Sequence, residues 1–241
     1  MSSIQPEKPA VTQIYKGYSI RAATPLTDAQ QAAIVRHLDA SSKKAAAPLG
    51  GRGRPVRTDL PGVGPVIIKQ YFRGGLIRYL NRRIHLRWGS VSRPRAEFDR
   101  LNQVRKIGIN APEPVAVIIR GNRFYRGWLV TRFIDGCRSL AEMCRTDPSG
   151  ARTVLDDFRR QVSVLIDHRI LHPDLHPGNV LIGPDKTVYL IDFDKTRTDI
   201  HDPGKLRSFY QHRWHRAVIK YRLPAWLDAA MAGIRHGDIP T

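Results

Sequence analysis

The chain has 241 residues, of which 41% are hydrophobic, and a formal net charge of +19. These values allow one large domain or two small lobes with a real hydrophobic core. No apolar run approaches the roughly twenty residues of a membrane span, and no secretion signal opens the chain, so we expect a soluble cytoplasmic protein. The charge indicates an anionic partner; nucleic acid, an anionic membrane surface and a phosphorylated lipid would each satisfy it.

The N-terminal part, residues 1–48, is predicted to be an extension that contains one short helix. Its first fifteen residues are polar, and we expect them to be disordered or loosely attached. Leu26–Ala40 has apolar residues at helical intervals, with Thr27 or Asp28 as a cap, which predicts the helix. Residues 41–48 are expected to be a flexible connector.

A glycine-rich stretch, LGGRGRP at 49–55, precedes a strand-like segment at 56–58. Such a turn lets backbone N–H groups approach phosphates without interference from a Cβ atom. Gly51 and Gly53 are therefore candidates for binding a nucleotide. A plain turn before a strand is the alternative.

A second glycine turn, at 62–64, leads into an apolar strand, Val66–Lys69. A lysine at the end of such a strand matches the Val-Ala-Ile-Lys pattern of kinases, so Lys69 is the candidate for binding the α- and β-phosphates. The alternative is a lysine that keeps a strand edge from aggregating.

Residues 71–100 combine a dense series of arginines with interleaved aromatic residues: Arg73, Arg78, Arg82, Arg83, Arg87, Arg93, Arg95 and Arg100, with Tyr71, Phe72, Tyr79 and Trp88. This pattern suits stacking on nucleic-acid bases or contact with lipid headgroups. We favour an anionic lipid or the phosphates of an acceptor. A solvated basic face with aromatic residues in the core is the alternative.

A helix is predicted from Arg93 to about Lys106, capped by Ser92. Glu97 lies on this helix at a suitable position to pair with Lys69 if the helix packs on the sheet. In kinases, the glutamate of the αC helix pairs with the phosphate-binding lysine in this way. An exposed glutamate with intrahelical partners is the alternative.

The next elements are two strands and two helices. Strands are predicted at 115–119 and 128–134 around a Gly121-Asn122 turn, and the Asp135-Gly136 pair is expected to end a first lobe at a hinge. A long helix beginning at Asp147-Pro148 and a C-terminal helix have buried stripes: Leu155, Phe158, Val162, Leu165 and Ile166, and Leu206, Tyr210, Trp214, Val218 and Tyr221.

Between these helices lies the stretch LHPDLHPGNVLIGPDKTVYLIDFDK, at 171–195. Its prolines prevent a continuous helix, so an ordered loop is predicted, followed by a hairpin of strands at 180–182 and 188–193. The hairpin brings Asp192 back beside the loop that carries Asp174 and Asn179.

Carboxylate and amide oxygens suit a magnesium nucleotide. In the kinase pattern an Asp accepts the hydroxyl proton, an Asn five residues later binds metal, and a later Asp holds the metal that bridges the phosphates. Asp174, Asn179 and Asp192 have this spacing. Asp194 replaces the glycine of Asp-Phe-Gly, and its role stays open. Acidic residues that cap turns are the alternative.

Histidine and cysteine patterns predict no further chemistry. His168, His172 and His176 are spaced by four, but the intervening prolines break the helix that a zinc site would require. His172 is instead expected to hold the catalytic loop by hydrogen bonds. Cys137 and Cys144 are taken as structural.

The sequence resembles the bacterial lipopolysaccharide core kinases, most closely the 3-deoxy-D-manno-octulosonic acid (Kdo) kinases. The similar segments are Gly51-Arg52-Gly53, the Lys69–Leu76 segment KQYFRGGL, RPRAEF at 93–98, APEP at 111–114 and LIDFD at 190–194. The His-Pro-Gly centre of the catalytic loop, at 176–178, departs from the family and is similar to other kinase branches.

The resemblance implies an α+β, two-lobed protein-kinase-like fold. Its N-lobe (49–135) has an antiparallel sheet and a helix that carries Glu97, and its C-lobe (136–241) is mainly helical. It implies ATP and Mg²⁺ as cofactors, with Asp174 as catalytic base, Asn179 and Asp192 as metal ligands and Lys69 on the phosphates.

The implied acceptor is a Kdo-lipid A precursor at the cytoplasmic face of the bacterial inner membrane, where the protein is peripheral. Nucleic acid is then not the expected partner, and the oligomeric state stays open. Two alternatives remain: a heptose kinase of the same pathway, and a non-catalytic kinase-like protein that binds anionic membrane or RNA.

Overall fold

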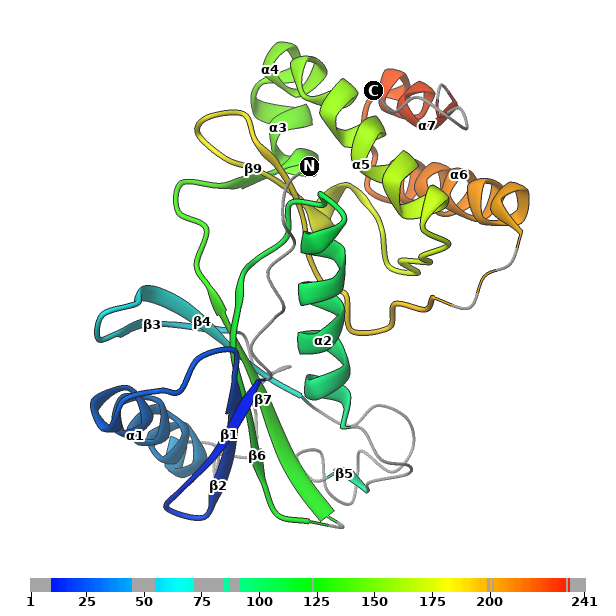
Figure 1. Cartoon of the computed structure of the whole chain (residues 1–241). Coiled ribbons are helices and arrows are strands. Elements are labelled where there is room, and N and C mark those ends of the chain that lie inside the picture. The colour runs from blue at the N-terminus through cyan, green and yellow to red at the C-terminus, as the bar shows by residue number, and fades with distance from the viewer. Residues whose placement is uncertain are drawn as a thin grey trace, which may run out of the picture. The chain divides into compact units, whose positions relative to one another are not determined.

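The chain adopts an α+β fold with an antiparallel sheet and helices (Figure 1). The computed structural model describes residues 10–44, 55–71, 85–86, 92–122, 124–198, 200, 202–232 and 234. The chain divides into two compact units, which are Met1–Phe98 with Pro114–Phe133, and Asp99–Glu113 with Ile134–Thr241. None of the described helices has the length and apolarity that crossing a membrane requires.

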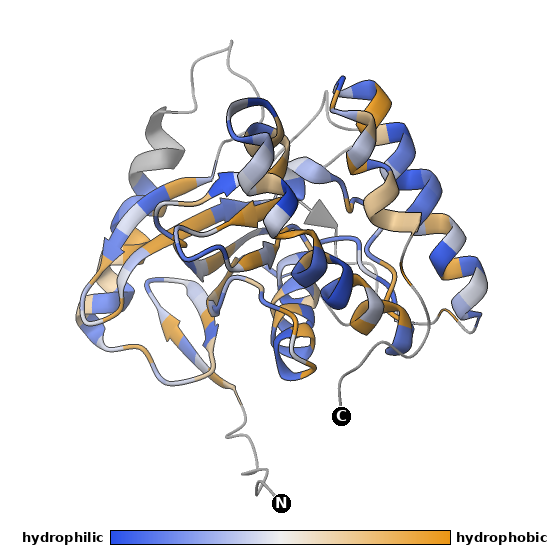
Figure 2. Ribbon diagram, turned by 90° about the horizontal axis from the view of Figure 1, so that it is seen from above, coloured by the Kyte–Doolittle hydropathy of each residue, from blue (hydrophilic) through white to orange (hydrophobic). Residues whose placement is uncertain are grey.

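An antiparallel sheet forms the first unit. Among the described residues its strand order is β1-β2-β6-β7-β4-β3, and β5 also pairs with β7. The strands are β1 (Val11–Tyr15), β2 (Tyr18–Ala22), β3 (Val56–Leu60), β4 (Gly64–Gln70), β5 (His85–Leu86), β6 (Pro114–Arg120) and β7 (Phe124–Arg132). In the sheet, hydrophobic residues (orange) are interspersed with polar ones (blue) (Figure 2). The predicted strands at 56–58, 66–69, 115–119 and 128–134 are thus confirmed, although β7 begins earlier and ends at Arg132.

Helix α1 (Asp28–Lys44) packs on one face of this sheet. Its Ile34, Val35 and Leu38 are buried in one cluster with sheet residues such as Ile68 and Trp128. The helix begins with a reciprocal cap, because the Thr27 hydroxyl accepts from the Gln30 N–H and the Gln30 side chain accepts from the Thr27 N–H.

The structure corrects the predicted N-terminal extension. Residues 11–15 form β1, which pairs with β2, and β2 pairs with β6, so this segment is part of the sheet. β1 could not be predicted from its sequence, because it is an edge strand whose side chains are mostly exposed and show no apolar alternation. Residues 41–44 continue α1 instead of forming a connector, since Ser and Lys interrupt a helix far less than the proline at 48 does.

The second unit consists mainly of helices around a small sheet of order β10-β9-β8. Its elements are β8 (Arg138–Ser139), α3 (Leu140–Thr146), α4 (Pro148–Thr153), α5 (Leu155–Asp167), η2 (Pro177–Asn179), β9 (Val180–Ile182), β10 (Val188–Leu190), α6 (Pro203–Lys220), η3 (Ala225–Leu227) and α7 (Ala229–Ala232). Helix α2 (Arg93–Lys106) matches its predicted bounds, and the division between the units falls within it, after Phe98.

Helices α5 and α6 form the core of the second unit through their apolar stripes. Phe158 stacks on Trp214 with ring centroids 4.6 Å apart, and the Trp214 indole N–H donates to the carbonyl of Leu227. The buried stripes predicted for both helices are confirmed, except that Tyr221 lies beyond the end of α6 and is 37% exposed.

The single long helix predicted from Pro148 is wrong. The chain forms α4, turns at Val154 and begins α5 at Leu155. The Ser-Gly pair at 149–150 and the β-branched pair at 153–154 have low helix propensity, which explains the interruption. Helix α3 was not predicted, although Ser139 caps it by accepting from the Glu142 N–H, a pairing that the Ser-x-x-Glu pattern signals.

Candidate active site

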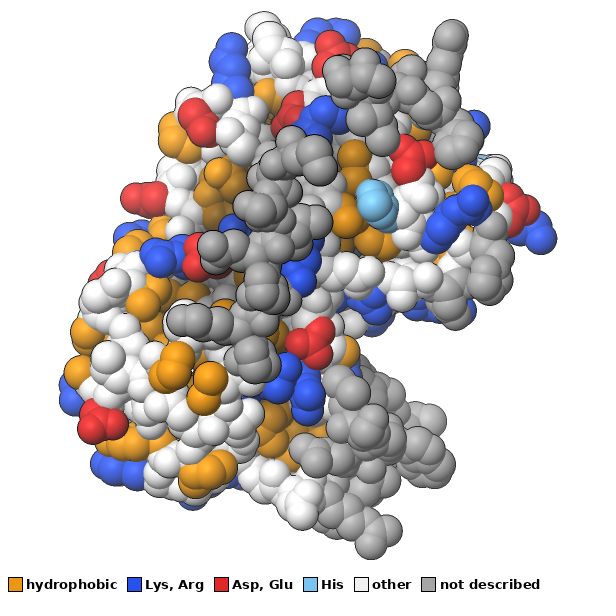
Figure 3. Space-filling model, in the orientation of Figure 1, with side chains coloured by type: hydrophobic (Ala, Val, Ile, Leu, Met, Phe, Trp, Pro, Cys, Tyr) orange, Lys and Arg blue, Asp and Glu red, His pale blue; other side chains and the backbone are white. Residues whose placement is uncertain are grey.

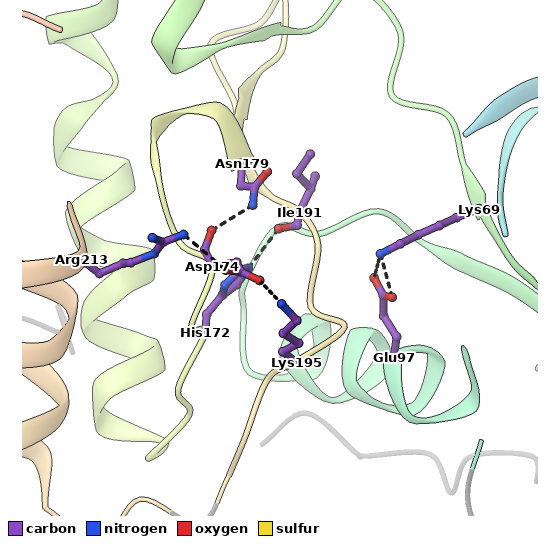
Figure 4. A network of polar contacts seen from close by, with 8 residues as sticks. All are labelled: Lys69, Glu97, His172, Asp174, Asn179, Ile191, Lys195 and Arg213. Atoms are coloured by element: carbon purple, nitrogen blue, oxygen red, sulfur yellow. Dashed lines mark hydrogen bonds and ion pairs between the residues drawn. The ribbon is translucent and has the colours of Figure 1, made fainter. Parts of the chain in front are cut away.

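Lys69 and Glu97 form an ion pair within the first unit (Figure 4). Lys69 Nζ lies 3.1 Å from Glu97 Oε1 and 3.0 Å from Oε2. Side chains alternate along β4, so Ile68 faces the α1 core and Lys69 faces the opposite side of the sheet, where the first turns of α2 bring Glu97. The pairing expected from the sequence is therefore present.

Tyr71 completes this pair. Its hydroxyl donates to Glu97 Oε2, and its ring lies 5.3 Å from Lys69 Nζ. The Glu97 side chain is only 4% exposed, and a buried carboxylate needs such partners to offset the loss of water. In the sequence, Tyr71 stands out only as one of the aromatic residues of the basic segment, and no local pattern predicts its contact with Glu97.

In the second unit, His172 anchors the loop that carries Asp174. Its backbone N–H donates to the Tyr210 hydroxyl at 2.9 Å, and the same hydroxyl donates to the carbonyl of Ile170 at 2.7 Å. His172 Nε2 lies 3.0 Å from the carbonyl oxygen of Ile191. The residue is fully buried and its ring packs edge-on against Phe193. The predicted role of His172 in holding the loop is confirmed.

Burial lowers the pKa of His172, and its hydrogen bond to Ile191 together with the carboxylates of Asp192 and Asp174 oppose this only in part. The neutral imidazole therefore donates from Nε2 to the Ile191 carbonyl, which can only accept. Its Nδ1 has no hydrogen-bond partner among the described residues.

Asn179 and Asp192 are positioned by the same loop and hairpin. The Asn179 amide nitrogen donates to the backbone carbonyl of Asp174 at 2.9 Å, which leaves its side-chain oxygen for another ligand. The Ile191 N–H donates to the Asn179 carbonyl at 3.1 Å, so Asp192 follows directly beside Asn179. β10 ends at Leu190, earlier than predicted, and Asp192 has a φ of 67°, a left-handed conformation that Asp tolerates better than most residues.

The donor set fits a magnesium ion that takes most of its ligands from phosphates and water. Among the described residues no three His, Cys, Asp or Glu side chains form a metal-binding group. Asn179 and Asp192 offer an amide oxygen and a carboxylate as possible protein ligands, and Mg²⁺ is usually held by one or two carboxylates plus substrate oxygens.

Two cations contact the carboxylate of Asp174 (Figure 4). Lys195 Nζ lies 3.3 Å from Oδ2, and Arg213 Nη2 lies 3.3 Å from Oδ1. Neither residue was predicted as part of the site. Lys195 could have been found from its place directly after the Asp-Phe-Asp segment. Arg213 has no local signal, because only the packing of α6 brings it to a residue 39 positions away.

The remaining predicted site residues, Gly51 and Gly53, lie outside the described residues, as does most of the basic segment at 71–100.

An ion-paired lysine on a sheet, together with an Asp and an Asn five residues apart on an ordered loop, is the arrangement typical of kinase-like phosphotransferases. The sequence comparison is consistent with it: the model of the Lipopolysaccharide kinase (Kdo/WaaP) family matches residues 53–221. The chain belongs to this family, and it is a phosphotransferase that acts on an alcohol group.

Several curated relatives named 3-deoxy-D-manno-octulosonic acid kinase are similar to the chain over most of its length. The protein from Vibrio vulnificus (strain YJ016) is 30% identical over 181 residues, covering 70% of this chain and 74% of the relative. The protein from Xylella fastidiosa (strain M12) is 30% identical over 183 residues, covering 75% and 72%. The protein from Xanthomonas oryzae pv. oryzae (strain PXO99A) is 30% identical over 181 residues, covering 72% and 69%.

Proposed function

We propose that the chain transfers the γ-phosphoryl group of ATP to a hydroxyl of Kdo on a Kdo-lipid A precursor, in the synthesis of the lipopolysaccharide core. The observation that carries the proposal is the Lys69–Glu97 ion pair, because a lysine fixed by a buried glutamate is what a kinase uses to bind nucleotide phosphates. The names of the relatives support the acceptor.

In this proposal each site residue has one task. Lys69 binds the α- and β-phosphates, Glu97 fixes Lys69, and the backbone around Gly51 and Gly53 covers the phosphates. Asp174 orients the acceptor hydroxyl and accepts its proton as the oxygen bonds to the γ-phosphorus and the bond to ADP breaks.

Asn179 and Asp192 hold Mg²⁺, which supplies charge neutralisation on the phosphates. His172 holds the loop that carries Asp174 in place through its hydrogen bonds to Tyr210 and Ile191. Positioning and charge neutralisation then provide most of the rate.

We further propose that the two units are the lobes of a protein-kinase-like fold, and that the protein works at the cytoplasmic face of the inner membrane as a peripheral protein. The net charge of +19 supports an anionic acceptor and an anionic membrane surface. Lys and Arg side chains occur at many places on the face in view in Figure 3.

The test is to incubate the purified protein with magnesium ATP and a panel of lipid A precursors that carry Kdo or heptose, and to identify the phosphorylated sugar by mass spectrometry. Phosphate on Kdo is the expected result. Phosphate on heptose alone would contradict the acceptor and favour the heptose kinase alternative. No transfer to any acceptor, with Asp174→Asn behaving as the unchanged protein in cells, would favour a non-catalytic binding protein.

A further inference from the structure

We propose that Arg213 binds the carboxylate of the acceptor sugar, so that the site selects an acidic sugar over a neutral one. The inference rests on the proposed function and adds to it the chemical feature that the site recognises. It starts from the contact between Arg213 Nη2 and Asp174 Oδ1, at 3.3 Å, on the residue that has to accept the hydroxyl proton.

Arg213 is not needed to hold Asp174 in place. The backbone of the loop is already fixed by the Asn179 side chain, by His172 and by the Tyr210 hydroxyl. Both carboxylate oxygens of Asp174 nevertheless have a cation at 3.3 Å. An acceptor hydroxyl must come within hydrogen-bond reach of this carboxylate. The bound acceptor therefore lies close to the two cations, and either of them can bind an anionic group that the acceptor carries.

The guanidinium of Arg213 suits a carboxylate better than Lys195 does. A planar guanidinium offers five N–H donors in a fork that matches the two oxygens of a carboxylate, whereas an ammonium is a point charge. Arg213 contacts Asp174 through Nη2, and its buried Nε has no hydrogen-bond partner among the described residues. Donor capacity thus remains for a second anion.

The two cations also differ in how firmly they are held. The Lys195 side chain is 65% exposed and follows Asp192 on the same segment, which suits contact with a phosphoryl group. The Arg213 side chain is only 29% exposed, and it extends from a helix that Tyr210 and Trp214 anchor in the core. Arg213 therefore approaches Asp174 from a different element than the candidate metal ligands do (Figure 4).

The charge class of the acceptor follows from this arrangement. Kdo is an acid and carries a carboxylate on its ring, whereas a heptose is neutral. Arg213 is the less exposed of the two cations beside the base, which favours Kdo as the sugar that is phosphorylated.

The test compares the full-length protein and Arg213→Gln on two acceptors, a Kdo-lipid A precursor and the same precursor with the Kdo carboxylate converted to a carboxamide. The unchanged protein should lose about 10- to 100-fold in kcat/KM on the carboxamide, the usual size of a hydrogen bond to a charged group. Arg213→Gln should lose a similar factor on the acid, but little more on the carboxamide, and its KM for ATP should not change.

Two further variants keep the result interpretable. Arg216→Gln removes a charge from an exposed position on the same helix and should retain the preference for the acid. Arg213→Lys keeps the charge without the fork and should retain part of the preference. It also serves as the test if Arg213→Gln fails to fold, which a urea unfolding curve would reveal.

Equal losses by Arg213→Gln on both acceptors would overturn the inference, because Arg213 would then act only through Asp174. A raised KM for ATP with the acid preference intact would overturn it in favour of a nucleotide phosphate. In a third outcome, Arg213→Gln would still reduce activity on the carboxamide but would have no effect on an acceptor without lipid phosphates. Arg213 would then bind those phosphates and not the carboxylate. Failure of the unchanged protein on every Kdo acceptor would instead contradict the proposed function, and the inference with it.

Discussion

Lys69 Nζ contacts both oxygens of the Glu97 carboxylate, at 3.1 and 3.0 Å, and Glu97 is almost completely buried while Lys69 is about one-third exposed. The lysine therefore gives the buried glutamate a charge partner, while its own side chain also reaches solvent, where a nucleotide can bind. The asymmetry gives Lys69 two functions that can be separated by measurement.

Lys69→Met should reduce kcat/KM by about 100-fold, because the charge that stabilises the transferring phosphates is removed. It should also reduce the free energy of unfolding by about 1–2 kcal/mol, since the buried Glu97 carboxylate loses the ammonium group that contacts both of its oxygens. Steady-state kinetics and urea unfolding measure the two effects. Adding Glu97→Gln to Lys69→Met should recover stability without recovering activity. Lys205→Met, which removes a lysine at an exposed position, is the control and should change neither quantity. A stable, fully active Lys69→Met protein would contradict the assignment.

Tyr71→Phe should lower the free energy of unfolding by about 1–2 kcal/mol, because the buried Glu97 carboxylate loses a hydroxyl donor. We also expect a higher KM for ATP, since Glu97 would hold Lys69 less firmly. Tyr221→Phe, at an exposed position, should leave both quantities unchanged. If Tyr71→Phe and Tyr221→Phe behave alike, Tyr71 does not support the ion pair.

Asp174→Asn should reduce kcat by about 10²- to 10⁴-fold, the range for a lost general base, while ATP binding measured by calorimetry stays the same. The fold should be retained, because the hydrogen bond from Asn179 that holds the loop goes to the Asp174 backbone carbonyl, which the substitution leaves in place. A variant that keeps its turnover would show that another group accepts the proton. Loss of ATP binding together with turnover would point instead to a structural role.

The free energy of unfolding should decrease as pH falls below about 6.5. Burial lowers the pKa of His172 in the folded chain. Below about pH 6.5 the unfolded chain therefore binds a proton at this histidine more readily than the folded chain does. Stability is therefore fully present above the unfolded pKa of histidine and is lost toward lower pH, by up to about 1.4 kcal/mol per pH unit for this residue.

Urea midpoints between pH 5 and pH 8 test this expectation. His172→Asn should be less stable at pH 8 but should show a shallower decrease toward pH 5. His212→Gln, at an exposed position, should follow the unchanged protein. The same slope in all three proteins would mean that other groups cause the acid sensitivity.

The parts of the structure that the sequence predicted are those whose signal is local. The apolar stripes of α5 and α6, the strand that ends near Lys69 and the loop between Pro173 and Asn179 each depend on residues a few positions apart. The Lys69–Glu97 pair spans 28 positions, and the sequence could propose it only because the strand and helix around it resemble a known pattern.

The missed features depend on packing that no short pattern contains. β1 was missed because its apolar residues do not alternate with polar ones and most of its side chains are exposed. The position of Arg213 follows from the burial of Trp214 and Tyr210, which sets the rotation of α6 about its axis. The residues that a helix side chain contacts on a neighbouring element can be inferred from sequence only when the rotation of the helix about its axis is known.

The single hydroxyl of Tyr210 joins α6 to both Ile170 and His172, on either side of the start of the catalytic loop. A fragment that ended before α6 would keep Asp174, Asn179 and Asp192, yet it would lack the bridge that fixes the chain leading into them. We therefore expect that a shortened protein keeps its activity only if it retains the C-terminal helix at least through Tyr210.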